Sequence, residues 1–249
     1  EISACLVGSE MCIRDRLARI ELVLVEANPG MRRRQQALLQ EADDLPLRWC
    51  SLDELRRAPV QGVVIAHELL DALPVERLIW RDGSLQQQWV ELDPNGELRT
   101  TDRPLPDGLQ QEINRVCSQG GIQFPPLDAE EGWTTEWNTA LPDWFAAVST
   151  AVNAGVLLVI DYALEAQRYY TARRSEGTLM AVRAQQAGLS PLDQPGEQDL
   201  TAHLCIEVVD DAAAQNGWLV GEQAKQGEAL LALGLAQRLH GLQQLPGQH

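Results

Sequence analysis

Short apolar runs recur along the chain and predict buried strands. Each run is four to seven residues long and is bounded by charged or turn-forming residues. Runs of this kind are typical of strands buried in a parallel sheet, where both faces are covered. The predicted strands cover residues 20–25, 47–50, 60–66, 156–161 and 218–223.

Helical patterns alternate with these runs. Asn28 is a good N-cap and Pro29 suits the first helical position, which predicts a helix that continues to about Ala42. Further helices are expected from Glu68 to a stop at Pro74 and over residues 141–153, 200–216 and 227–242. Alternation of strands and helices favours an α/β fold with a doubly wound, mostly parallel sheet.

Two regions depart from this alternation. Asp82-Gly83 separates two strand-like runs and predicts a hairpin, and a further turn is expected at residues 94–96. Residues 99–140 are rich in proline, glycine and acidic residues, and they are expected to be an inserted region of loops and short helices. Residues 163–198 are expected to be a long polar connection with weak helical character.

The first sixteen residues differ from the rest of the chain. Residues 1–16 follow neither a helical nor a strand period, and they lack the features of a signal peptide. Their sequence resembles a translated sequencing adapter, so residues 1–16 are expected to be a non-native segment, the alternative being a disordered natural terminus. Residues 17–249 are then expected to form one domain, which includes the inserted region at about 99–140.

Composition narrows the classes of function. The net charge of −16 disfavours nucleic acid as a partner, and Arg32-Arg33-Arg34 is interpreted as a solvated helix face. No apolar run is long enough to span a membrane. The five cysteines form no CxxC pair, which argues against a disulfide framework or a cysteine zinc site and favours a cytoplasmic location.

Acidic residues follow two of the predicted strands. Glu26 ends one strand, where a carboxylate could accept both hydroxyls of a ribose; the alternative is an ordinary charge at a helix start. Glu68 and Asp71 follow another strand and would share one face of a helix, because they are three residues apart. This pair could orient a cationic substrate or bind a cofactor amine, or it could only stabilise the helix start.

The roles of four other residues stay open. Asp161 and Tyr162 end the strongest strand, and Thr201 and His203 follow a Pro-Gly turn. His203 could act as a base, although a structural histidine is the more common case. His203 and Cys205 alone provide too few ligands for a metal site, so no metal is predicted.

Five segments in this order resemble one protein family. They are Val25-Glu26-x-x-Pro29, Ala66-x-Glu68-Leu69-Leu70-Asp71-Ala72-Leu73-Pro74-Val75, Leu158-Val159-Ile160-Asp161-Tyr162, Gly177-Thr178-Leu179 and Pro195-Gly196 with Asp199-Leu200-Thr201-Ala202-His203. The chain resembles, over residues 17 to about 240, the methyltransferase family that includes the mitochondrial complex I assembly factor MidA and its bacterial relatives. The resemblance implies a Rossmann-like class I fold and S-adenosyl-L-methionine as cofactor.

The resemblance also implies roles in cofactor binding. Glu26 would hold the ribose, and Ser51 and Leu52 would lie near the adenine. His67 is assigned to the cofactor site by position, although the family usually has asparagine there. The first strand and the glycine-rich loop of the family are expected to be missing, because their place is taken by residues 1–16. This chain is therefore expected to bind the cofactor weakly or not at all.

Glu68 and Asp71 are the residues that the resemblance implies for catalysis, between cofactor and methyl acceptor. The mitochondrial members are held to methylate an arginine of a respiratory complex subunit, so a protein substrate is expected. The two carboxylates could hold a guanidinium by bidentate hydrogen bonds. One alternative is a non-catalytic assembly factor or chaperone-like module that keeps the fold. Another is a nucleotide-dependent oxidoreductase, but the motif that follows the predicted strand 60–66 fits the methyltransferase family better.

Overall fold

The computed structural model describes residues 20–40, 46–184 and 186–243 of the chain. The predictions for residues 1–16 and for the glycine-rich loop therefore lie outside the described residues. The fold belongs to the mixed α/β class, with both parallel and antiparallel strand pairs. The chain divides into two compact units, the first made of Glu1–Val63 and Asp143–Val156 and the second of Val64–Pro142 and Leu157–His249.

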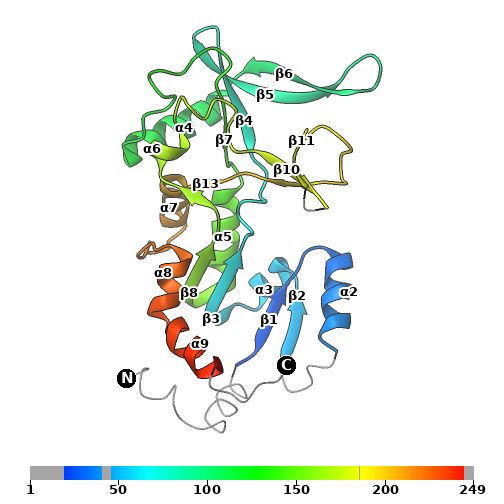
Figure 1. Ribbon diagram of the computed structural model, residues 1–249, viewed down its shortest axis with the longest axis vertical. Helices are drawn as coiled ribbons and strands as arrows, with labels where there is room; N and C mark the ends of the chain where they lie inside the picture. The colour runs from blue at the N-terminus through cyan, green and yellow to red at the C-terminus, as the bar shows by residue number, and fades with distance from the viewer. Residues whose placement is uncertain (1–19, 41–45, 185, 244–249) are drawn as a thin grey trace. The chain divides into compact units, whose positions relative to one another are not determined.

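The first unit contains a pair of parallel strands. Strand β1 (Leu22–Val25) and strand β2 (Leu47–Cys50) pair in register, with Val25 opposite Cys50, and they lie side by side with helix α2 in Figure 1. Both strands agree with the sequence prediction to within two residues. Because the strands run in the same direction, the residues that follow them emerge at one edge.

Two helices follow these strands. Helix α2 (Pro29–Leu38) starts as predicted: the Asn28 side chain accepts hydrogen bonds from the backbone N–H groups of Gly30 and Met31. It ends earlier than predicted, at Leu38. Helix α3 (Leu52–Arg57) was not predicted. Its N-cap carries a serine–glutamate capping box, a signature that is readable in the sequence.

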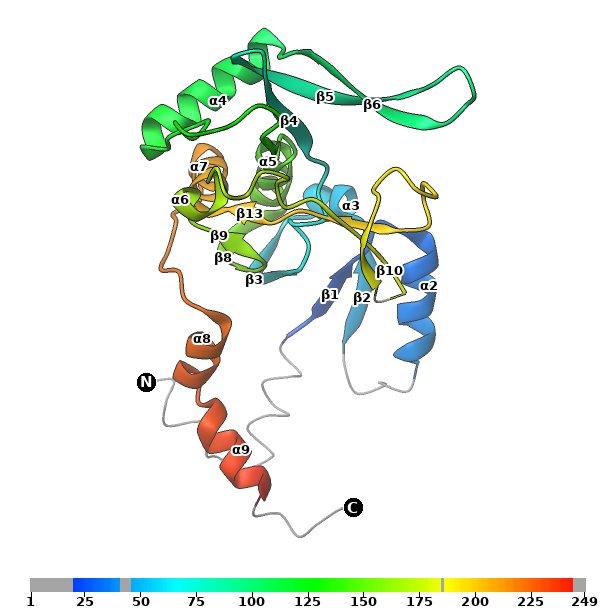
Figure 2. The same ribbon diagram turned by 45° about the horizontal axis from the view of Figure 1, so that its top comes forward.

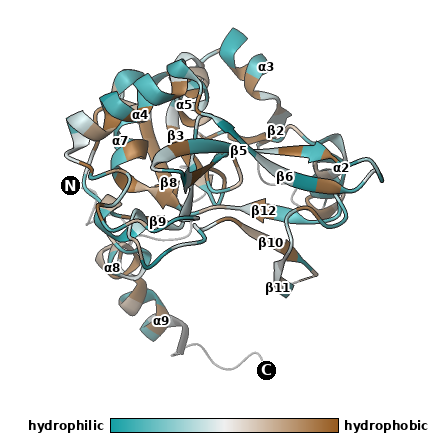
Figure 3. Cartoon of the chain, turned by 90° about the horizontal axis from the view of Figure 1, so that it is seen from above, coloured by the Kyte–Doolittle hydropathy of each residue, from teal (hydrophilic) through white to brown (hydrophobic). Residues whose placement is uncertain are grey.

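Strands β3 (Val60–His67) and β8 (Val152–Ile160) form a second pair, and helix α5 (Leu141–Ala151) leads into β8. Figure 3 draws β8 in brown, as its strongly hydrophobic sequence requires. Within the first unit the two backbones approach closely at Gly155. A Cβ atom added there would lie 1.9 Å from the carbonyl oxygen of Gly62, so only glycine fits this position without a backbone shift.

The second unit is built on a four-stranded antiparallel sheet with the order β6-β5-β4-β7. Its strands are β4 (Glu76–Arg81), β5 (Ser84–Leu92), β6 (Leu98–Pro104) and β7 (Thr134–Trp137). The predicted hairpin is confirmed: Asp82 and Gly83 form a two-residue turn between β4 and β5, both with positive φ, as a type I′ turn needs. Figure 2 shows the β5–β6 hairpin extending beyond its neighbours in this sheet.

The prediction for residues 99–140 was wrong about their structure. Strand β6, the 14-residue helix α4 (Asp107–Gly120) and strand β7 fall in this region, instead of loops and short helices only. Trp137 and Trp133, in and beside β7, are almost fully buried, and Phe124 packs against both rings. This region therefore supplies much of the core of the second unit.

In the remainder of the second unit, several helices and strands differ from the sequence prediction in their bounds. The connection 163–198 holds short strands and one helical turn, where a long polar connection was expected. A helix was expected from Leu200, but residues 199–201 and 204–205 are strands, and the helix starts at Ile206. The elements are β9 (Ala163–Leu164), α6 (Ala166–Tyr169), β10 (Met180–Arg183), β11 (Gln186–Leu189), β12 (Asp199–Thr201), β13 (Leu204–Cys205) and α7 (Ile206–Gln215).

At the C-terminal end, the predicted strand at 218–223 was wrong, because these residues have no regular structure. The helix predicted over 227–242 is divided into α8 (Gln226–Ala232) and α9 (Leu235–Gln243) at Gly234, whose φ is +89°. Among the described residues, no helix combines the length and the apolar character needed to cross a bilayer.

Candidate functional site

In the first unit, Glu26 and Ser51 lie at one edge. They directly follow the paired strands β1 and β2, and the backbone N–H of Glu26 donates to the carbonyl of Cys50. The sequence reasoning placed both residues after strands, and the structure brings these two positions together. The carboxyl edge of parallel strands is where ligands bind in open α/β sheets.

The Glu26 carboxylate is fixed in place but not saturated. One oxygen accepts from the backbone N–H of Asn28 at 2.8 Å, and the other accepts from the Gln35 side-chain amide at 3.1 Å. The Gln35 amide oxygen in turn accepts from the indole N–H of Trp49. A carboxylate offers about four acceptor positions, so roughly two remain for hydroxyl donors.

Ser51 and Leu52 are engaged by helix α3. The Ser51 hydroxyl accepts from the Glu54 backbone N–H, and the Glu54 carboxylate accepts from the Ser51 backbone N–H at 2.7 Å. That backbone hydrogen bond lowers the pKa of Glu54. Leu52 packs against a small core that contains Cys50 and Leu55. The serine hydroxyl still has its proton to donate.

In the second unit, Asp161 organises the turn that follows β3. One of its oxygens accepts from three successive backbone N–H groups, those of residues 69–71, at 3.0–3.3 Å. Its other oxygen accepts from the N–H of Tyr162 at 2.8 Å. The N–H of Glu68 donates to the carbonyl of Ile160, so the carboxyl ends of β3 and β8 lie together. Sequence reasoning singled out Asp161 but assigned it no role.

Glu68 does not begin a helix, which corrects the prediction. Residues 68–73 are bends and turns, and Glu68 has a φ of +47°, a conformation that non-glycine residues rarely adopt. Its side chain is 52% exposed and lies 4.0 Å from the imidazole of His67, which is also exposed. The negative charge of Glu68 first, and a hydrogen bond to it second, raise the pKa of the neighbouring Tyr162.

Asp71 faces a different environment from Glu68. It is only 8% exposed, and its carboxylate accepts a 2.7 Å hydrogen bond from the Thr201 hydroxyl. Its carbonyl accepts from the N–H of Ala202. Glu68 and Asp71 therefore belong to one turn, but the shared helix face that the sequence predicted does not exist. Asp71 joins this turn to residues 201–202.

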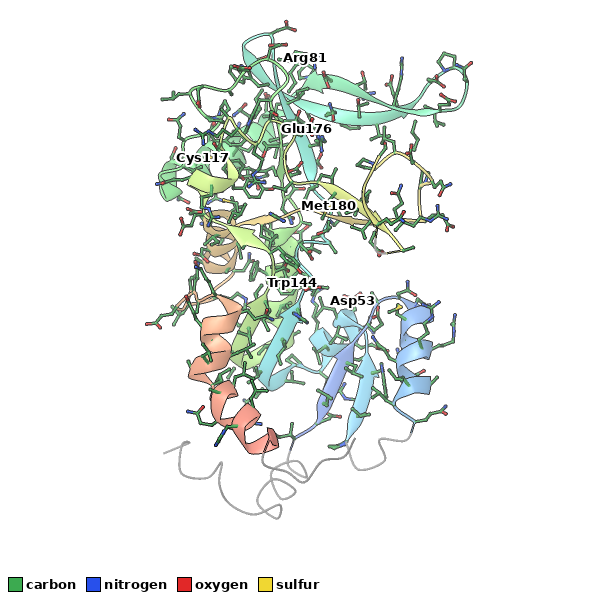
Figure 4. The ribbon with its side chains drawn as sticks, in the orientation of Figure 1. Asp53, Arg81, Cys117, Trp144, Glu176 and Met180 are labelled. Carbon is green, nitrogen blue, oxygen red and sulfur yellow. The ribbon has the colours of Figure 1, made fainter. Side chains whose placement is uncertain are left out.

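Sequence reasoning missed the buried Glu136 entirely. This residue of β7 is 1% exposed, and its carboxylate accepts from the Thr178 N–H at 2.7 Å and from the Thr178 hydroxyl at 3.0 Å. Arg77 forms an ion pair with it at 3.3 Å. The Arg77 guanidinium also donates to the carbonyl of Glu176, which is labelled in Figure 4. Burial and the charge of Glu136 raise the pKa of Tyr169.

Gly177 makes room for this carboxylate. A Cβ atom at position 177 would lie 2.2 Å from a Glu136 oxygen, and the φ of Gly177 is +75°. The glycine that the sequence showed beside Thr178 is thus required by the buried acid. Within the described residues, no group of three or more histidine, cysteine, aspartate or glutamate residues could hold a metal ion.

Comparison with known proteins gives one family and two structures. The family model described as "Putative S-adenosyl-L-methionine-dependent methyltransferase" matches residues 5–222. A COG1565 superfamily member from Burkholderia thailandensis, described as a "likely methyl transferase" bound to S-adenosyl-homocysteine, matches with a TM-score of 0.77 and 27% identity. That match covers 94% of this chain and 60% of that chain.

A second COG1565 superfamily structure from the same organism has a TM-score of 0.75 and 29% identity, over 89% of this chain and 56% of that chain. The chain thus spans less than two thirds of the length of either structure. No curated protein matches the sequence.

Proposed function

We propose that this chain, which belongs to the S-adenosyl-L-methionine-dependent methyltransferase family whose model covers residues 5–222, transfers a methyl group to a protein side chain such as that of arginine. The family match carries the proposal, because it extends over the segments that bear Glu26, Glu68 and Asp161. The resemblance further implies a Rossmann-like fold. The acids that follow the strand pairs β1–β2 and β3–β8 support this, because ligands of such folds bind at carboxyl strand ends.

Glu26 is proposed to hold the ribose of the cofactor. Its two contacts fix the side chain and leave acceptor capacity for a pair of neighbouring hydroxyls. Ser51 and Leu52 are proposed to lie near the adenine, the first with a hydroxyl proton to donate and the second with an apolar side chain. His67 is proposed to contribute to the cofactor site from its position before Glu68.

Glu68 and Asp71 are proposed to serve the methyl acceptor, Glu68 by facing it and the buried Asp71 by holding the turn that carries Glu68. Methyl transfer is an in-line displacement, so alignment of the acceptor contributes more than covalent assistance. Glu68 offers an exposed carboxylate that could hold a guanidinium by charge-assisted hydrogen bonds. The net charge of −16 would also attract a basic segment of a protein substrate, for which the resemblance suggests a subunit of a respiratory complex.

Titration calorimetry with S-adenosyl-homocysteine tests the cofactor assignment. The titration should extend to about millimolar ligand, which corresponds to roughly −4 kcal/mol. We expect saturable binding that Glu26→Gln weakens by about tenfold, the equivalent of one hydrogen bond to a charged group. Glu21→Gln is the matched control, because Glu21 is an exposed acid of the same unit whose partner is Arg48.

Methyl transfer is tested with isotopically labelled S-adenosyl-L-methionine and synthetic peptides that contain arginine or lysine, followed by mass spectrometry. Transfer to arginine that Glu68→Gln abolishes, with S-adenosyl-homocysteine binding retained, is the expected result. Absence of binding at millimolar ligand would contradict the proposal and favour a non-catalytic assembly module. Binding together with transfer to lysine only would retain the activity and refute the arginine assignment.

A further inference from the structure

The segment Thr201–His203 is held in place at its first two residues by Asp71. The Thr201 hydroxyl donates to the Asp71 carboxylate at 2.7 Å, and the Ala202 N–H donates to the Asp71 carbonyl at 2.9 Å. These partners are 130 residues apart in sequence, and Asp71 is buried. The turn after β3, which carries Glu68, is therefore joined directly to this segment.

The segment is also held at its third residue. The His203 backbone N–H donates to the Thr178 hydroxyl oxygen at 3.0 Å, and that hydroxyl donates to the buried carboxylate of Glu136. Arg77 neutralises Glu136. Two buried acidic residues, Asp71 and Glu136, thus fix the backbone of residues 201–203, Glu136 through the Thr178 hydroxyl, and these contacts set the position of His203.

The His203 ring lies against Tyr162. The two rings are nearly parallel, at 17°, with centroids 6.1 Å apart, and the Tyr162 carbonyl accepts from the N–H of Leu204. Tyr162 is 56% exposed and adjoins Glu68. The imidazole therefore lies beside Tyr162, the exposed side chain that follows β8 and adjoins Glu68.

The surroundings of the His203 ring are described for one of its nitrogens. Nδ1 is buried and has no hydrogen-bond partner among the described residues, although His203 as a whole residue is only half-buried. A buried polar atom without a partner is costly, and such atoms in native structures call for a functional or structural explanation. Because Nδ1 is enclosed by the protein, Nε2 is the nitrogen that is left for a ligand.

We propose that His203 Nε2 accepts the proton that the methyl acceptor loses, and that the Asp71–Thr201 hydrogen bond positions it. In this step the lone pair of an acceptor nitrogen forms the N–C bond, the S–C bond of the methyl donor breaks with its electron pair remaining on sulfur, and the N–H proton passes to Nε2. This inference rests on the proposed function. His203 would be a catalytic residue, and Asp71 and Thr201 positioning residues.

Partial burial of His203 favours the neutral form of its imidazole. Burial first, and then the positive charge of Arg174, lower the pKa of His203, while the negative charges of Asp71, Glu136 and Asp161 oppose this shift. A proton acceptor must be deprotonated before the reaction, and its pKa should lie near or below the working pH.

Nuclear magnetic resonance of the wild-type chain provides a test that needs no methyl acceptor. The imidazole Cε1–H signals are titrated with pH, with and without saturating S-adenosyl-homocysteine. We expect the His203 signal to report a pKa below that of an exposed histidine, and ligand to shift both the signal and its midpoint. His240, on α9, is the internal control, and bound S-adenosyl-homocysteine should leave its signal unchanged. This measurement needs only the wild-type chain.

Variants separate catalysis from structure. With a peptide that accepts the methyl group in the assay described above, His203→Gln should reduce methyl transfer by about a hundredfold. It should also remove the decrease in rate at low pH that protonation of the imidazole causes. Its affinity for S-adenosyl-homocysteine should change less than twofold. Thr201→Val should lower the rate of methyl transfer but keep its decrease at low pH, because the imidazole is still present but less well placed. His240→Gln should behave as wild type.

Two results would overturn the inference without affecting the proposed function. One is a His203 signal that does not change when S-adenosyl-homocysteine binds. The other is a His203→Gln variant with the rate and pH profile of wild type. If S-adenosyl-homocysteine does not bind the wild-type chain at all, the proposed function fails first, and the inference falls with it. If His203→Gln does not fold, the wild-type titration still decides.

Discussion

The acids at the two strand-pair ends are held by different kinds of neighbour. In the first unit, Glu26 is fixed by Asn28 and Gln35, which are two and nine residues away along the chain. In the second unit, Asp161 is fixed by N–H groups that are 90–92 residues away. Glu26 keeps acceptor capacity, whereas Asp161 uses one oxygen to close the turn at residues 69–71 and the other to accept from the N–H of Tyr162. An acid at a strand end is therefore not by itself a ligand site.

The acids of the second unit also differ in whether their carboxylates are bound within the fold or exposed. Asp71 and Asp161 are committed to hydrogen bonds within the fold, while Glu68 has an exposed carboxylate on a backbone with positive φ. Strained backbone of this kind is concentrated at functional sites, where the surroundings enforce it. The turn after β3 thus uses two acids for shape and presents the third to solvent.

The largest expected effect is at Asp161. Replacing it by alanine leaves four backbone N–H groups without their acceptor, so Asp161→Ala should lower the free energy of unfolding by about 3 kcal/mol or more. Urea unfolding monitored by circular dichroism measures this. Asp53→Ala is the control, because Asp53 (labelled in Figure 4) is an exposed acid whose ion pair with Arg56 should contribute below ~1 kcal/mol. Equal losses in the free energy of unfolding of both variants would contradict the structural role given to Asp161.

The next effect concerns the bond between Asp71 and Thr201. A double-mutant cycle with Asp71→Asn, Thr201→Val and the double variant should give a coupling energy of about 1–2 kcal/mol, because the bond joins a hydroxyl to a buried carboxylate. Urea unfolding of all four proteins provides the cycle. Additive losses would mean that the two side chains stabilise the chain independently.

Glu26→Gln should affect stability less. Its partners are local and its surroundings are partly exposed, so the loss in free energy of unfolding should stay below ~1 kcal/mol. Thermal unfolding beside wild type gives the value. A loss as large as that of Asp161→Ala would make Glu26 a structural acid and weaken its assignment to the ribose.

The smallest effect is the titration of Tyr162. The charge of Glu68 raises the pKa of this tyrosine, so Glu68→Gln should move the ionisation of Tyr162 to lower pH. Ultraviolet absorbance follows the phenolate directly, and Tyr162 should ionise before Tyr169 and Tyr170, whose pKa values burial raises. Glu165→Gln is the control. An unchanged midpoint in Glu68→Gln would place the two side chains further apart than described.

Features with local causes could be predicted from the sequence. The start of α2 follows from Asn28 and Pro29, and the β4–β5 turn follows from Asp82-Gly83, because each cause lies within a few residues of its effect. The capping box of α3 has the same local character, since Glu54 is three residues from Ser51.

Features with distant causes could not be predicted. Glu68 and Asp71 have helical spacing, but Asp161 binds the intervening N–H groups and imposes a turn. Residues 200–205 looked helical, but they pair with β10 and β9 instead. For the same reason, the sequence could identify the acidic residues of the candidate site but not their contacts or exposure. The contacts that distinguish Glu68 from Asp71 come from parts of the chain about 90 and 130 residues away.

The contact between Gly155 and Gly62 has a consequence for how variation among relatives should be interpreted. Because any side chain at position 155 would collide with a neighbouring backbone, natural selection would retain glycine there whether or not the protein binds a nucleotide. Glycines are commonly taken as markers of phosphate or cofactor loops. An invariant glycine at this position would instead record the inheritance of a strand-to-strand contact, and it would persist even in descendants that had lost catalysis.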